Sequence, residues 1–132
     1  MNRVKQALLI CCLAVIATFP AIAAELGTLK HSDRGVTVAV TPQNLTVDAK
    51  TWEFKIVLDT HSQNLNDDLL ASSALVAGGG RHAPTAWEGA PPGGHHREGT
   101  LKFNPVTPLP ETIELQIQRP GESGPRSFQW KL

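Results

Sequence analysis

The chain has almost no sulfur-containing residues. Of its 132 residues, two are cysteines and one is methionine. Cys11 and Cys12 lie in an N-terminal segment that we expect to be removed on export, and the methionine is Met1. The remaining chain can therefore form no disulfide and supply no cysteine nucleophile, and a copper site built on thiolate and thioether ligands is excluded.

An excess of charge of one sign is also lacking. Twelve basic residues balance twelve acidic ones. Without Arg3 and Lys5 in the N-terminal segment, ten basic and twelve acidic residues remain, a net charge of −2 with histidine neutral. This balance argues against a protein that binds nucleic acid or an anionic membrane through charge.

The chain has one apolar run, from Leu8 to Phe19, preceded by two basic residues and followed by small residues at 21–24. A membrane-spanning helix needs about 20 apolar residues, so this run is short for a span. We interpret residues 1–24 as a secretory signal peptide, with an uncleaved anchor as the alternative. The protein is then expected to be periplasmic or secreted, with no membrane span in residues 25–132.

Residues 25–132 contain several short segments of alternating apolar and polar residues, separated by turns rich in glycine and proline. The clearest segment is 51–60. Further strands are expected at 36–40, from about 72 to 77, and at 81–87, 99–103, 112–118 and 127–132. This pattern predicts one all-β domain, an antiparallel two-sheet sandwich that is immunoglobulin-like in its general build.

Large apolar residues on one face of these strands should form the core. Because the sandwich has no disulfide, packing alone must hold it together. The expected core residues are Trp52, Phe54, Ile56, Leu58, Phe103, Ile113, Leu115, Ile117, Phe128 and Trp130.

A loop rich in glycine and proline, within 87–103, carries a His-His-Arg triplet. Imidazole is the commonest protein ligand of zinc and copper, and loops at one end of a sandwich cluster together. His61, at the end of another expected strand, could therefore converge with His95 and His96. We predict a Cu(II) or Zn(II) site on these three residues. Side chains that could orient the ligands or fix the loop are Asp59, Glu88 and Arg97.

The alternative is that this loop is only scaffolding. Neighbouring residues of a strand point to opposite faces, so His95 and His96 seldom bind one ion together. In this interpretation Arg97 pairs with Asp59, Glu88 or Glu98. The protein is then a structural or interaction module that binds another envelope protein.

Trp87, beside Pro91 and Pro92, could also serve as a recognition surface. The competing interpretation places Trp87 over the end of the core and assigns the prolines to the path of the loop. We favour that packing role.

We expect no enzymatic activity. Asp59 and His61 lie on one strand, but the chain has no Gly-x-Ser-x-Gly elbow to present a nucleophile. It also has no phosphate-binding loop, dinucleotide fingerprint or calcium loop.

Two motifs together resemble uncharacterised small bacterial exported β-sandwich domains. These are Asp59-Thr60-His61-Ser62 and the stretch that joins Trp87-Glu88-Gly89 to Gly93-Gly94-His95-His96-Arg97. The resemblance spans most of residues 25–132 and includes the ending 128–132. It implies an exported, compact β fold, and it implies no activity and no functional residue.

Overall fold

A computed structural model describes residues 26–132, so the predicted signal peptide lies outside the described residues. The described part contains nine strands and one short helix. The elements are β1 (Leu29–Asp33), β2 (Val36–Gln43), β3 (Trp52–Thr60), α1 (Leu69–Ser72), β4 (Ser73–Ala77), β5 (Gly80–His82), β6 (Ala86–Gly89), β7 (His96–Phe103), β8 (Thr112–Ile117) and β9 (Arg126–Lys131).

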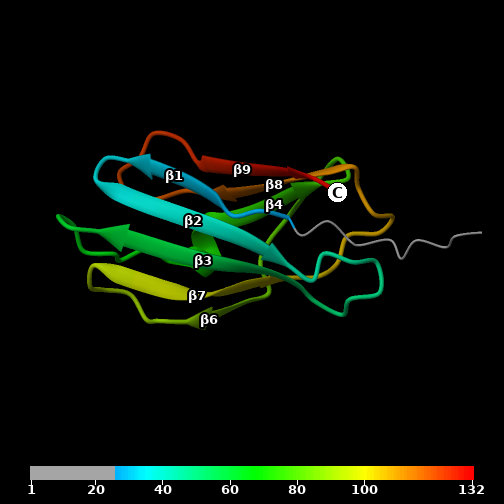
Figure 1. The fold of residues 1–132 in the computed structure, drawn as a ribbon, viewed down its shortest axis with the longest axis horizontal. Coiled ribbons are helices and arrows are strands. Elements are labelled where there is room, and N and C mark those ends of the chain that lie inside the picture. The colour runs from blue at the N-terminus through cyan, green and yellow to red at the C-terminus, as the bar shows by residue number, and fades with distance from the viewer. Residues whose placement is uncertain (1–25) are drawn as a thin grey trace, which may run out of the picture.

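The strands form two sheets that pack against each other (Figure 1). The first sheet has the order β1-β2-β3-β7-β6, and the second has the order β5-β4-β8-β9. All strand pairs within the two sheets are antiparallel. The predicted all-β, two-sheet sandwich is therefore confirmed.

All ten predicted core residues are buried, and the most exposed of them, Trp130, retains 7% of its accessible surface. Aromatic contacts join the two sheets. The Phe54 ring lies 5.6 Å from that of Phe103 in an edge-to-face arrangement, and 5.9 Å from that of Trp130 in the opposite sheet. Aromatic pairs prefer such tilted and edge-on geometries. Packing thus closes the core without a disulfide.

The strand predicted over 81–87 is in fact two strands in different sheets. β5 pairs with β4 in the second sheet, and β6 pairs with β7 in the first. Pro84 lies between them, where the chain crosses from one sheet to the other. Proline has no N–H group to donate to a ladder, so a continuous strand through this position is disfavoured.

β7 begins earlier than expected, at His96 instead of Gly99. Gly99 does not interrupt the strand, because it pairs with Ile56 on one side and Gly89 on the other. The His96-Arg97 pair therefore belongs to a strand, and its two side chains point to opposite faces of the sheet.

The sandwich has two ends of different character. The end on the left in Figure 1, here called the loop end, is formed by residues 34–35, 61–68, 90–95 and 118–125. The opposite end, here called the terminal end, is formed by residues 26–28, 44–51, 78–79, 104–111 and Leu132.

Candidate functional site

The loop end brings together both motifs that the sequence singled out. β3 and β7 are neighbours, with Asp59 paired to His96, and the Thr60 N–H donates to the His95 carbonyl at 2.9 Å. The strand end that leads to His61 thus lies beside the start of the strand that carries His96. The predicted convergence of the two segments is observed at the level of the backbone.

His96 lies between two carboxylates on the outer face of the first sheet. Its Nδ1 is 2.5 Å from Asp59 Oδ1, and its Nε2 is 3.5 Å from Glu98 Oε2. Glu98 also pairs with Lys55 at 2.7 Å. The bond to Asp59, followed by the charge of Asp59 and the bond to Glu98, raises the pKa of His96 above 6.5. Bonding to Lys55 lowers the pKa of Glu98. Protonated imidazole is therefore favoured here, and it competes with any metal for the ring nitrogens.

The three imidazoles do not form a ligand cluster. His61 and His95 are exposed, and His96 is paired as just described. Within residues 26–132, no group of three or more histidine, cysteine, aspartate or glutamate side chains is arranged to hold a metal ion. Metal binding by these histidines stays a prediction.

Glu88 pairs with Lys102 at 2.9 Å, and Lys102 also contacts Glu53 at 3.6 Å. In the ladder Glu88 lies opposite Thr100, away from His96 at the start of β7. This carboxylate therefore belongs to a row of ion pairs along the outer face and does not orient a histidine.

Arg97 is buried, with 2% of its surface exposed. Its Nη1 donates to the carbonyls of Asp67 at 2.7 Å and Leu65 at 3.3 Å, and its Nη2 donates to that of Ala90 at 3.3 Å. The guanidinium therefore holds the loop through main-chain carbonyls and not through the carboxylates that the sequence suggested. The reason is that Arg97 points inward, whereas Glu98 points outward.

Trp87 is partly buried against the core, and its indole N–H donates to the Ala90 carbonyl at 3.1 Å. The Arg97 guanidinium lies 5.7 Å from the centre of its ring, within range of a cation–π interaction. The ring also covers Gly99, where an added Cβ would lie 2.6 Å from Trp87 Cζ2. Trp87 is thus a packing residue that closes the sheet edge beneath the loop.

Hydrogen bonds hold the loop 90–95 against the 61–68 loop. Main-chain hydrogen bonds join it to Leu65, with Gly93 N donating at 2.7 Å and Gly94 O accepting at 3.0 Å. Gly94 N also donates to Asn64 Oδ1 at 2.8 Å. Four residues of this ordered loop are nevertheless exposed: Pro91, Pro92, Gly94 and His95.

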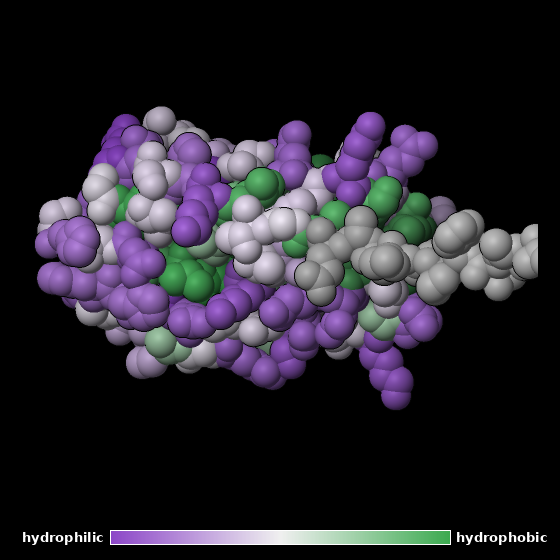
Figure 2. Space-filling model, in the orientation of Figure 1, coloured by the Kyte–Doolittle hydropathy of each residue, from purple (hydrophilic) through white to green (hydrophobic). Residues whose placement is uncertain are grey.

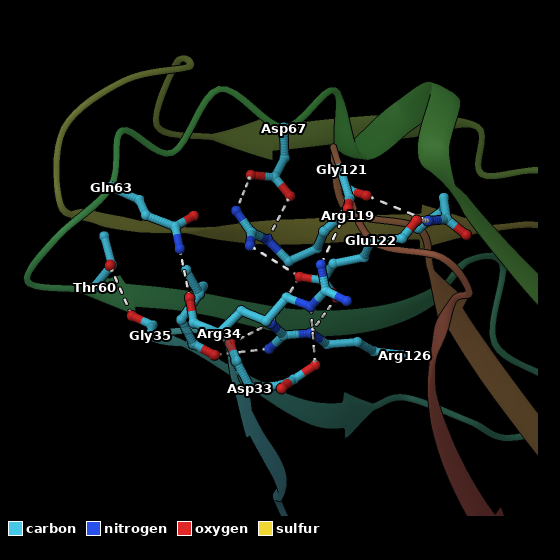
Figure 3. A network of polar contacts seen from close by, with 12 residues as sticks. Asp33, Arg34, Gly35, Thr60, Gln63, Asp67, Arg119, Gly121, Glu122 and Arg126 are labelled. Carbon is cyan, nitrogen blue, oxygen red and sulfur yellow. Dashed lines mark hydrogen bonds and ion pairs between the residues drawn. The ribbon is translucent and has the colours of Figure 1, made fainter.

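Beneath the loops lies a charged network that the sequence reasoning missed (Figure 3). Asp67 accepts two hydrogen bonds from Arg119, at 2.9 and 3.1 Å. Glu122 bridges Arg119 at 3.2 Å and Arg126, whose Nε and Nη2 both lie 2.9 Å from its carboxylate. Arg126 also donates to the Val36 carbonyl at 2.8 Å. These bonds join the 61–68 and 118–125 loops to the first sheet.

The strand pattern contained a signal for these arginines. Residues two apart on a strand share a face, so Arg126 must face inward with Phe128 and Trp130. By the same alternation, Arg119, just past the end of β8, and Arg97, near the start of β7, also face inward. Three inward arginines near strand ends indicate buried polar partners there, because an unpaired buried charge is strongly destabilising.

Comparisons with protein-family models, with curated proteins and with solved structures found no match to this chain. Among the residues that the structure describes, no helix is long and apolar enough to cross a membrane.

Proposed function

We propose that this chain is an exported, non-enzymatic interaction module that recognises another envelope protein through its loop end. The observation that supports this most directly is the state of the loop 90–95. It is exposed to solvent, yet it is held by hydrogen bonds to the 61–68 loop and by the buried Arg97.

A loop ordered before binding loses little conformational entropy when a partner docks. The buried ion pairs beneath it supply the rigid support. Clustered loops at one end of a β-sandwich are also the arrangement by which immunoglobulin variable domains bind their targets. Exposed groups available to a partner are mixed in chemistry: Pro91 and Pro92 are apolar, whereas the side chains of His61, Asn64 and His95 carry groups able to form hydrogen bonds with a partner.

A competition experiment tests this proposal. The exported chain is immobilised, exposed to solubilised envelope proteins of the cells that produce it, and the bound protein is identified. Free wild-type chain should displace it, whereas a Pro91→Ser/Pro92→Ser/His95→Ser variant should not, because the variant loses the exposed loop surface and keeps the buried support.

The matched control carries Asp48→Ser and Lys50→Ser, two exposed substitutions at the terminal end. It should compete as well as the wild-type chain. Equal competition by the loop variant would show that recognition lies elsewhere on the molecule.

Binding of Zn(II) or Cu(II) through His61, His95 and His96 is the second candidate function. One observation favours it: a carboxylate on one ring nitrogen orients an imidazole for a metal at the other, and Asp59 bonds Nδ1 of His96 in this way. A metal at Nε2 would take the place of the contact with Glu98, which lies 3.5 Å from that nitrogen. Calorimetric titration of tag-free protein should then show one equivalent of metal, with affinity lost as the imidazoles protonate. Absence of binding at micromolar metal would exclude this function.

A further inference from the structure

The terminal end gathers most of the exposed aliphatic side chains. Within residues 26–132, five large hydrophobic residues are exposed, and three of them lie here: Val47 at 61%, Leu109 at 43% and Leu132 at 37%. A fourth, Leu29 at 37%, is the first residue of β1, beside this end. Figure 2 shows hydrophobic residues at this end, on the right, and others further left on the same face. Single exposed aliphatic residues are ordinary, but their concentration at one end of a molecule indicates a contact surface.

These side chains are not needed to close the core. Leu26, Leu45 and Ala49 already pack against the core at this end. Hydrogen bonds fix the segments that carry the exposed residues. Trp52 Nε1 donates to the Thr46 carbonyl at 3.0 Å, and Leu132 N donates to the Glu111 carbonyl at 2.8 Å. The aliphatic groups are therefore displayed on ordered backbone.

Three exposed lysines lie near these residues in the sequence. Lys50 lies in the same loop as Val47, and Lys131 precedes Leu132. Lys30 follows Leu29 in β1, so its side chain points to the opposite face of the strand. Exposed aliphatic groups next to lysines suit the interface of a bilayer, where apolar groups enter the acyl boundary and ammonium groups meet phosphates. Asp48 and Glu111 at the same end offset part of this positive charge, so the contact depends mainly on apolar burial.

The chain also enters the sandwich at this end, since the Gly27 carbonyl accepts a hydrogen bond from Trp130 Nε1 at 2.9 Å. In the sequence, the apolar run ends at Phe19, seven residues before Leu26. An extended segment of that length spans at most about 25 Å. In the alternative in which residues 1–24 are kept as an uncleaved anchor, the terminal end is thus the part of the sandwich nearest to the lipid.

From these observations we infer that the terminal end is a lipid-contact surface, on which Leu29, Val47, Leu109 and Leu132 touch a bilayer. The inference is independent of the proposed function and adds an orientation to it. With the terminal end on the membrane, the loop end points away from the lipid, where a partner can reach it.

The experiment uses the full chain in phosphatidylcholine–phosphatidylglycerol vesicles that contain a doxyl-labelled lipid quencher. Cys11→Ser and Cys12→Ser remove the natural thiols, and a fluorophore is attached through Val47→Cys or, as a matched control at the loop end, through Asn64→Cys. Lipid should quench the fluorophore at position 47 and leave the one at position 64 unaffected. Equal quenching at both positions, or none at position 47, would overturn the inference.

A second variant distinguishes contact of the terminal end with lipid from proximity that is caused only by the N-terminal segment. Leu109→Ser with Leu132→Ser, added to the chain labelled at position 47, should cause a loss of quenching, because the apolar contact is weakened while the N-terminal segment is unchanged. Undiminished quenching would mean that the tether alone keeps the domain near the lipid, and the proposed surface would be wrong. Both substitutions are at exposed positions, and circular dichroism checks that the fold is retained.

Discussion

Asp67 and Arg119 lie 52 residues apart in the chain and form a doubly hydrogen-bonded ion pair inside the sandwich, at 2.9 and 3.1 Å. Their side chains are 0% and 4% exposed. The pair ties the loop that follows β3 to the loop that follows β8, and Leu65 in the first of these loops bonds to the loop 90–95. The candidate recognition surface therefore depends on a buried salt bridge.

Replacing Asp67 with alanine should lower the free energy of unfolding by about 3–5 kcal/mol, because Arg119 would be left as a buried charge without its main partner. Urea unfolding measures this loss. Asp48→Ala, at an exposed loop position, is the control and should change stability by no more than about 0.5 kcal/mol. A loss below 1 kcal/mol at Asp67, on the order of a surface substitution, would show that solvent reaches the pair.

Glu122 should make stability depend on acid pH. Hydrogen bonding to Arg126 lowers the pKa of this carboxyl from its ordinary value of 4.5. A carboxyl with a lowered folded-state pKa stabilises the fold above its unfolded-state pKa, and the contribution is lost as pH falls through the folded-state pKa. The stability advantage of the wild type over Glu122→Gln should thus be complete at neutral pH and shrink below pH 4.5. An advantage that stays constant from pH 7 to strong acid would contradict this role.

Substitution of Gly99 with alanine should displace Trp87, since the new Cβ would lie 2.6 Å from the indole ring and 2.7 Å from Gly89 Cα. We expect a cost of about 1–3 kcal/mol, as for overpacking in a core. The support of the loop 90–95 would also weaken, so the amides of Gly93 and Gly94 should exchange hydrogen faster. Gly124→Ala, at a position with open space around the Cβ, should alter neither stability nor exchange.

The imidazole of His96 should titrate above 6.5 in the folded protein, because Asp59 and Glu98 favour its charged form. A raised folded-state pKa gives a stabilising contribution that is complete below 6.5 and is lost as pH rises through the folded-state value. NMR titration of the ring protons measures the shift. Asp59→Asn should return the pKa toward 6.5, whereas Asp48→Asn should leave it unchanged. Insensitivity of the His96 titration to Asp59→Asn would mean that the pair does not persist in solution.

The candidate site was only partly predictable. The sequence suggested that the segment ending at His61 would meet the His-His-Arg loop, and the pairing of β3 with β7 brings them together. It named Asp59 among the side chains that could orient a histidine, and Asp59 does bond His96. It did not assign Glu98 to His96, although residues two apart on one strand share a face. Arg97 was assigned carboxylate partners, whereas it binds the carbonyls of a loop 30 residues earlier in the chain.

The sequence by itself determined the all-β class, the positions of most strands and the ten residues of the core. These follow from local alternation, since successive side chains on a strand point to opposite faces. Only the tertiary structure decided that the 81–87 segment divides between two sheets, that Arg119 meets Asp67, and that Arg126 caps the Val36 carbonyl from 90 residues away. Such contacts depend on which strand ends lie together in space, and a pattern with a period of two residues carries no information about that.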